Sequence, residues 1–62
     1  MKCSQFLRLL RKNGWVIVRQ SGSHVVLQNS SKPELGRITF PNHGSKELKK
    51  GLEKALRKQA GL

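Results

Sequence analysis

The segments Trp15-Val-Ile-Val-Arg19 and His24-Val-Val-Leu-Gln28, with Ser21-Gly-Ser23 between them, decide the fold of this chain. Both outer segments are rich in β-branched and large apolar residues, which favour strands, and the short Gly- and Ser-containing segment favours a tight turn. The pattern predicts a β-hairpin with strands at residues 15–20 and 24–28. His24 then stands at the junction of turn and strand, on a rigid backbone and open to solvent.

A helix is predicted before the hairpin. Four apolar residues have the spacing i, i+3, i+4, i+7 of one helix face: Cys3, Phe6, Leu7 and Leu10. Ser4 is a suitable N-cap, and Gly14 suits the left-handed position that follows a helix. We therefore expect a helix over residues 4–13.

A loop and a third strand are predicted after the hairpin. The polar segment 29–36 contains Pro33 and Gly36, which interrupt regular structure. Residues 37–41 alternate in polarity, which places Ile38 and Phe40 on the inner face of a strand.

A second helix is predicted over residues 46–60. Ser45 is its expected N-cap, and Glu47 falls in the first turn, where the helix dipole favours a negative charge. Its expected apolar stripe consists of Leu48, Leu52, Ala55, Leu56 and Ala60.

The order of elements is αβββα, and the 62 residues suffice for one domain, residues 1–62. We predict an α+β fold in which both helices lie on one face of a three-stranded antiparallel sheet, because this arrangement buries every apolar stripe. His24, Arg37 and Thr39 are then on the uncovered face.

The charge is strongly unbalanced, with 13 Lys and Arg against 3 Asp and Glu and a formal net charge of +10. Such an excess favours a polyanionic partner: nucleic acid first, an acidic protein second, an anionic membrane third. No apolar run approaches the roughly 20 residues that span a bilayer. The single cysteine, Cys3, cannot form an internal disulfide, and the N-terminal segment lacks the apolar run of a signal peptide. The cytoplasm is therefore the expected compartment.

Part of the charge falls on one face of the second predicted helix. The spacing i, i+4, i+8, i+11 defines this stripe: Lys46, Lys50, Lys54 and Arg57. Phosphates and an acidic protein surface are both suitable partners for such a stripe.

The chain resembles the HicA toxins of bacterial HicA–HicB toxin–antitoxin systems. The resemblance depends on five segments in their order and spacing: Lys12-Asn-Gly-Trp15, Gly22-Ser-His24, Phe40-Pro-Asn-His43, Glu47-Leu-Lys-Lys-Gly51 and Lys58-Gln-Ala-Gly-Leu62. It implies a fold like that of double-stranded-RNA-binding domains, a ribosome-independent mRNA interferase activity and neutralisation by the antitoxin HicB. The histidine of the Gly-Ser-His motif, here His24, is then the catalytic residue, and Gly22 and Ser23 shape its turn.

The chemistry of RNA is consistent with one histidine as the main catalytic group. RNA carries its own nucleophile, the 2′-OH, so cleavage needs one base and cations that hold the phosphate, without metal or cofactor. Imidazole is well matched to proton transfer near neutral pH. A metal site built from His24, His43 and Cys3 has the wrong spacing and no carboxylates. For His43, a general acid and a group that hydrogen-bonds within its loop both remain open.

Two functions remain open for this sequence: an endoribonuclease toxin with His24 as general base, and a non-catalytic RNA-binding module of the same fold. A DNA-binding or ribosomal accessory protein is a more distant third. The expected partners are mRNA and a HicB-type antitoxin whose acidic surface covers His24 in a hetero-oligomer. The candidate RNA-contacting residues are Arg37, His43, Lys46, Lys50, Lys54 and Arg57.

Overall fold

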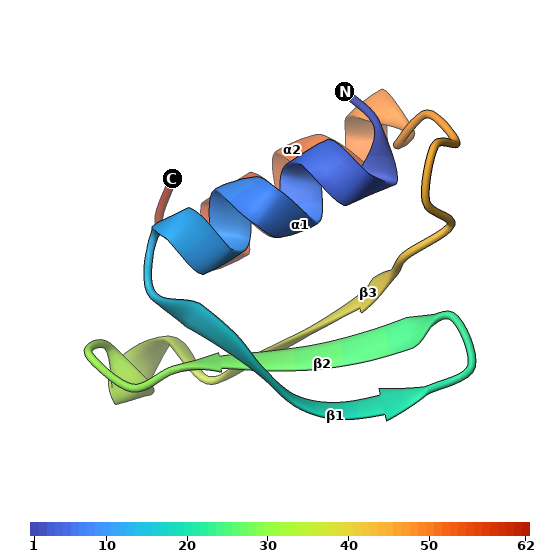
Figure 1. Ribbon diagram of the computed structural model, residues 1–62. Helices are drawn as coiled ribbons and strands as arrows, with labels where there is room; N and C mark the ends of the chain where they lie inside the picture. The colour runs from blue at the N-terminus through green and yellow to red at the C-terminus, as the bar shows by residue number, and fades with distance from the viewer.

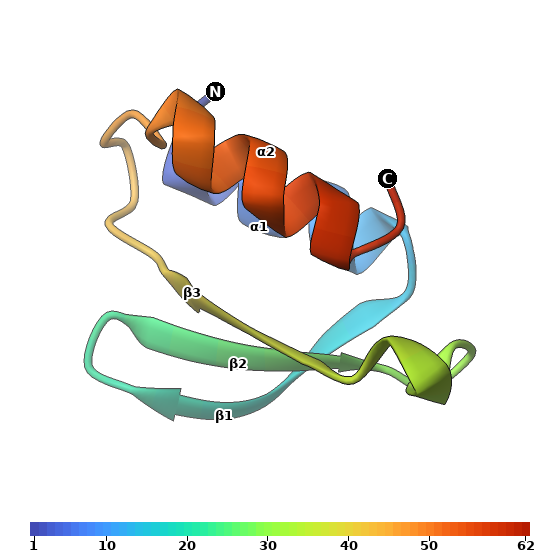
Figure 2. The same ribbon diagram turned by 180° about the vertical axis from the view of Figure 1, so that it is seen from behind.

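Three antiparallel strands form a sheet in the order β1-β2-β3, and two helices cover one of its faces (Figures 1 and 2). The computed structural model describes residues 1–62. Its elements are α1 (Cys3–Lys12), β1 (Trp15–Ser21), β2 (His24–Asn29), the 3₁₀ turn η1 (Pro33–Leu35), β3 (Arg37–Pro41) and α2 (Lys50–Gln59). The predicted α+β fold of order αβββα is confirmed. We call the sheet face under the helices the inner face and the opposite one the outer face.

The core lies between the inner face and the two helices. Alternation along the strands buries Val25 and Leu27 of β2, and Ile38 and Phe40 of β3, as predicted. The remaining buried apolar residues come from β1, the helices and the segment before α2: Trp15, Cys3, Phe6, Leu10, Leu48, Leu56 and Ala60. The rings of Phe6 and Phe40 pack at a tilt of 58°, with centroids 5.6 Å apart, and so join α1 to the sheet.

Helix α1 begins slightly earlier than its cap signal predicts. Its N-cap is Lys2 rather than Ser4, and the Lys2 N–H donates to the side-chain oxygen of Gln5 at 2.7 Å. The backbone around Lys2 is held in place because the Cys3 N–H donates to the Lys46 carbonyl at 2.9 Å. At the other end Gly14 has φ +93°, the left-handed conformation expected after the helix.

Helix α2 begins at Lys50, four residues later than predicted. The expected cap at Ser45 is wrong, because the segment before the helix pairs with the N-terminus of the chain: Lys2 and Glu47 form an antiparallel bridge. The Leu48 N–H also donates to the Met1 carbonyl at 2.8 Å. Glu47 accordingly forms an ion pair with the N-terminal amino group and does not lie in the first helical turn.

The buried stripe of α2 is narrower than predicted. Leu56 and Ala60 are buried, whereas Ala55 is exposed and Leu52 is 37% exposed. Leu48 is buried but precedes the helix. Ten residues of helix are therefore enough to close the core on this side.

Candidate active site

His24 is the first residue of β2, exposed on the outer face of the sheet. The turn before it contains Gly22 at φ +59°, a conformation that glycine adopts without strain. His24 pairs with Ser21 on one side and with Pro41 on the other. The Ser23 carbonyl accepts the Asn42 N–H at 2.7 Å, so the turn is also fixed to the end of β3.

The imidazole of His24 is free to contact a ligand. None of the side-chain hydrogen bonds of the protein involves it. Both helices lie on the opposite face of the sheet, so no element covers the outer face (Figure 1). Neither of the two hollows of the surface includes His24. An open face with a side chain on a fixed backbone suits a polymer better than a small molecule, because small molecules bind in concave pockets.

His43 lies in the loop between β3 and α2, at the same end of the molecule as the His24 turn (Figure 1). The loop is well tied: the Gly44 N–H donates to the side-chain oxygen of Asn42 at 3.2 Å, and the Ser4 N–H to the Gly44 carbonyl at 2.9 Å. His43 itself is exposed. Its side chain lines a hollow of about 330 Å³ together with Lys46 and residues that precede α2.

The predicted basic stripe does not form one continuous helix face. Lys46 lies in the loop beside His43, whereas Lys50 and Lys54 are exposed on α2, in the layer on the far side of the sheet from the outer face. Arg57 is half-buried, with its Nε donating to Glu53 at 2.9 Å and its guanidinium 6.0 Å from the centroid of the Phe6 ring.

Arg37 is on the outer face, as expected, but far from His24. It is the first residue of β3, and His24 pairs with the last, Pro41. Four residue steps in a strand correspond to about 13 Å. The structure therefore gathers His24, His43 and Lys46 at one end of the molecule and leaves Arg37 at the other.

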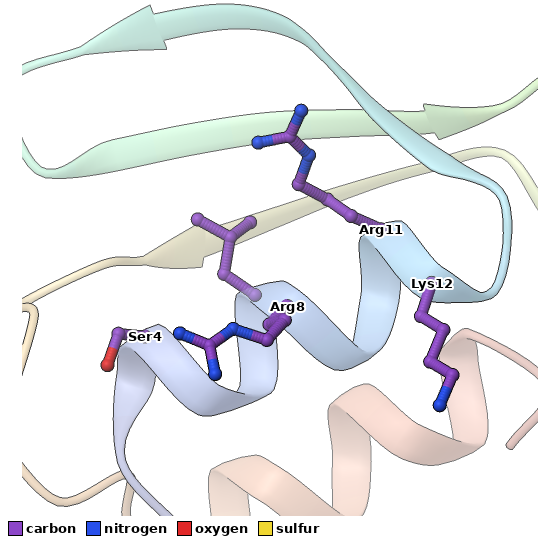
Figure 3. A pocket seen from close by; sticks show the side chains of 5 residues that line it. Ser4, Arg8, Arg11 and Lys12 are labelled. Atoms are coloured by element: carbon purple, nitrogen blue, oxygen red, sulfur yellow. The ribbon is translucent and has the colours of Figure 1, made fainter.

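Basic residues at two places on the surface are not among the predicted site residues. One place is beside α1, where a hollow of about 620 Å³ is lined by Ser4, Leu7, Arg8, Arg11 and Lys12. In Figure 3, Arg8 points toward Ser4, and Arg11 extends toward the strands. The spacing i, i+3, i+4 of its three cations was readable from the sequence. The other is Arg19, which pairs with Val26 and so shares the outer face with His24.

No three His, Cys, Asp or Glu side chains lie close enough together to hold a metal ion. Neither helix has the length and apolar character needed to cross a membrane.

Fold and site together define a class: small basic αβββα proteins that present a histidine from a hairpin on an open sheet face. The chain belongs to the HicA toxin family of bacterial toxin–antitoxin systems, since the family model described as "HicA toxin of bacterial toxin-antitoxin" matches residues 3–62. A relative from Pseudomonas fluorescens (strain Pf0-1), "Probable mRNA interferase HicA", is 39% identical over 62 residues. That match covers 100% of this chain and 97% of the relative.

Proposed function

We propose that this toxin is an endoribonuclease that cleaves mRNA in the cytoplasm, with His24 as the general base. The observation that carries the proposal is the exposed imidazole, free of protein hydrogen bonds, on the central strand β2, which is paired on both sides. The 39% identical relative, named as a probable mRNA interferase, supports the same activity.

The reaction is a transesterification. His24 takes the proton of a ribose 2′-OH, and the 2′-oxygen attacks the adjacent phosphorus. The bond from phosphorus to the 5′-oxygen breaks, and that oxygen leaves as an alcohol after receiving a proton from water or from His43. The products are a 2′,3′-cyclic phosphate and a 5′-hydroxyl end. Gly22 and Ser23 hold the turn that positions His24.

Basic side chains contact the RNA backbone, both at the end of the molecule that carries His24 and elsewhere on its surface. His43 and Lys46 lie at the same end of the molecule as His24, because their loop follows the strand that pairs with it. Contacts further along the backbone are proposed for Lys50, Lys54, Arg57 and Arg37. Such contacts supply affinity with little sequence preference.

The antitoxin partner is proposed to be an acidic HicB-type protein that covers His24 in a hetero-oligomer. The net charge of +10 and the open face around His24 support this arrangement. Antitoxin and RNA then exclude each other. A ternary complex seen by native mass spectrometry under full inhibition would contradict simple occlusion.

The decisive experiment is incubation of the protein with a defined single-stranded RNA in EDTA, followed by analysis of the product ends. Cyclic phosphates are expected from the wild type, and His24→Ala should give no cleavage. His43→Gln separates the two candidate proton donors: a reduced cleavage rate would assign the leaving-group proton to His43, and an unchanged rate would assign it to water. Binding without cleavage by the wild type would support the alternative function, a non-catalytic RNA-binding module.

A further inference from the structure

A β-bulge interrupts the hairpin that carries His24. Ile17 pairs with Leu27, and the next pair is Arg19 with Val26, so Val18 is an extra residue in β1. Trp15 and Ile17 face inward, opposite inner-face residues of β2. Strict alternation from them would place Arg19 on the inner face as well. The extra residue shifts the alternation by one and puts Arg19 on the outer face.

The bulge makes Arg19 a neighbour of His24. On the outer face, the end row across the sheet is Ser21, His24 and Pro41. The adjacent outer row begins with Arg19, two residues before Ser21, so Arg19 is diagonal to His24 across the hairpin. Diagonal neighbours in a sheet are about 7–8 Å apart, which a long side chain spans.

Arg19 is also free of competing partners. It is exposed, and the two ion pairs of the protein use Glu47 and Glu53 instead. A guanidinium has the planar, forked set of donors that matches two oxygens of a phosphate. A free arginine and a free imidazole therefore lie as diagonal neighbours on one open face.

We propose that Arg19 is a second catalytic residue, which binds the scissile phosphate beside His24. This inference depends on the proposed ribonuclease activity. When the 2′-oxygen attacks, negative charge accumulates on the non-bridging phosphate oxygens, and the guanidinium stabilises that charge. The effect of Arg19 therefore appears in the rate of the chemical step as well as in RNA affinity.

No other arginine is placed for this role. Arg37 shares the outer face, but it pairs with Gln28, two outer rows from the row of His24. Arg8 and Arg11 belong to α1, which lies on the inner face of the sheet. Arg8 is a matched control for Arg19: it has the same side-chain type and charge and is exposed, but it lies on α1, in the layer away from His24.

The test compares Arg19→Gln, Arg19→Lys and Arg8→Gln with the wild type in single-turnover cleavage of one single-stranded RNA at saturating protein, in EDTA. Arg19→Gln should lower the saturating rate by about 10²–10³-fold, as for loss of one donor to a developing oxyanion. Arg19→Lys should recover part of this loss, because the charge remains but the fork is lost. Arg8→Gln should stay within a few-fold of the wild type.

Affinity is measured separately on a His24→Ala background, where RNA is bound without being cut. Each loss of a phosphate contact reduces the magnitude of the negative slope of log K against log[salt] by about 0.7 on a single strand. If the wild type cuts and Arg19→Gln matches Arg8→Gln in saturating rate, Arg19 is not catalytic and the ribonuclease activity stands. If the wild type does not cut, the proposed activity and this role of Arg19 both fail. Thermal unfolding of each variant should match the wild type, since both arginines are exposed.

Discussion

Replacing Arg57 by Gln tests whether this cation stabilises the fold. Its ion pair with Glu53 at 2.9 Å has the i,i+4 spacing, which contributes about 0.3–0.5 kcal/mol. Its position 6.0 Å from the Phe6 ring centroid adds about 0.5 kcal/mol, the value for a partly exposed cation–π pair. The sum is about 1 kcal/mol. In a domain of this size, 1 kcal/mol corresponds to a fall in the melting temperature of about 4–8 °C.

The assay is thermal unfolding followed by far-ultraviolet circular dichroism. Lys54→Gln is the matched control, because Lys54 is exposed on the same helix and its loss should change stability by less than about 0.5 kcal/mol. Comparing Arg57→Gln, Glu53→Gln and the double variant isolates the contribution of the ion pair to the free energy of unfolding. The RNA salt slope is measured in parallel. If Arg57→Gln melts like the wild type but its RNA affinity depends less steeply on salt concentration, Arg57 contacts RNA and does not stabilise the fold.

Four further substitutions test two turns, the core and the candidate catalytic residue. Gly14→Ala should lower the free energy of unfolding by more than the roughly 1–2 kcal/mol of a left-handed alanine, because the new Cβ would lie 3.3 Å from the Asn29 side-chain oxygen. Urea unfolding of this variant, and of its combination with Asn29→Ala, measures the part of the loss that is due to this contact. Gly22→Ala meets no atom within 4 Å and should cost only the backbone strain, so equal losses at the two glycines would refute the contact with Asn29. Leu27→Ala should lower the free energy of unfolding by about 2–5 kcal/mol, because it leaves a cavity in the core. His24→Ala should leave the melting temperature unchanged while cleavage is lost, because His24 is exposed. A large fall in the melting temperature of His24→Ala would contradict this placement.

The strands and the core were predictable because their signals are local. Alternation placed Val25, Leu27, Ile38 and Phe40 correctly, and Gly22 marked the turn. These features depend on a period of two and on one left-handed residue, both of which a short window of sequence contains.

The start of α2 was not predictable, because a distant segment decides it. Ser45 and Glu47 are good local signals for a helix start, but the backbone around Glu47 pairs with Lys2 from the other end of the chain. The position of Arg57 was not predictable for the same reason. Its spacing places it on the basic stripe, but its contact with Phe6 of α1 brings together two distant parts of the chain.

The β-bulge at Val18 was not predictable for a different reason. Nothing in a run of β-branched residues marks the extra one, and the interruption appears only when β1 is aligned with β2. The outward position of His24 was predictable from the turn and from strand alternation, whereas the outward position of Arg19 depends on strand register.

The position of α2 after all three strands has a consequence for synthesis of the toxin. A nascent chain that has emerged only as far as β3 already contains the His24 hairpin. It still lacks Leu56 and Ala60, so the part of the core that α2 closes is open to water. So small a domain cannot spare part of its core, and its sheet is not expected to be stable before α2 is translated. The backbone that presents His24 is therefore held firmly only after the last helix has packed onto the inner face.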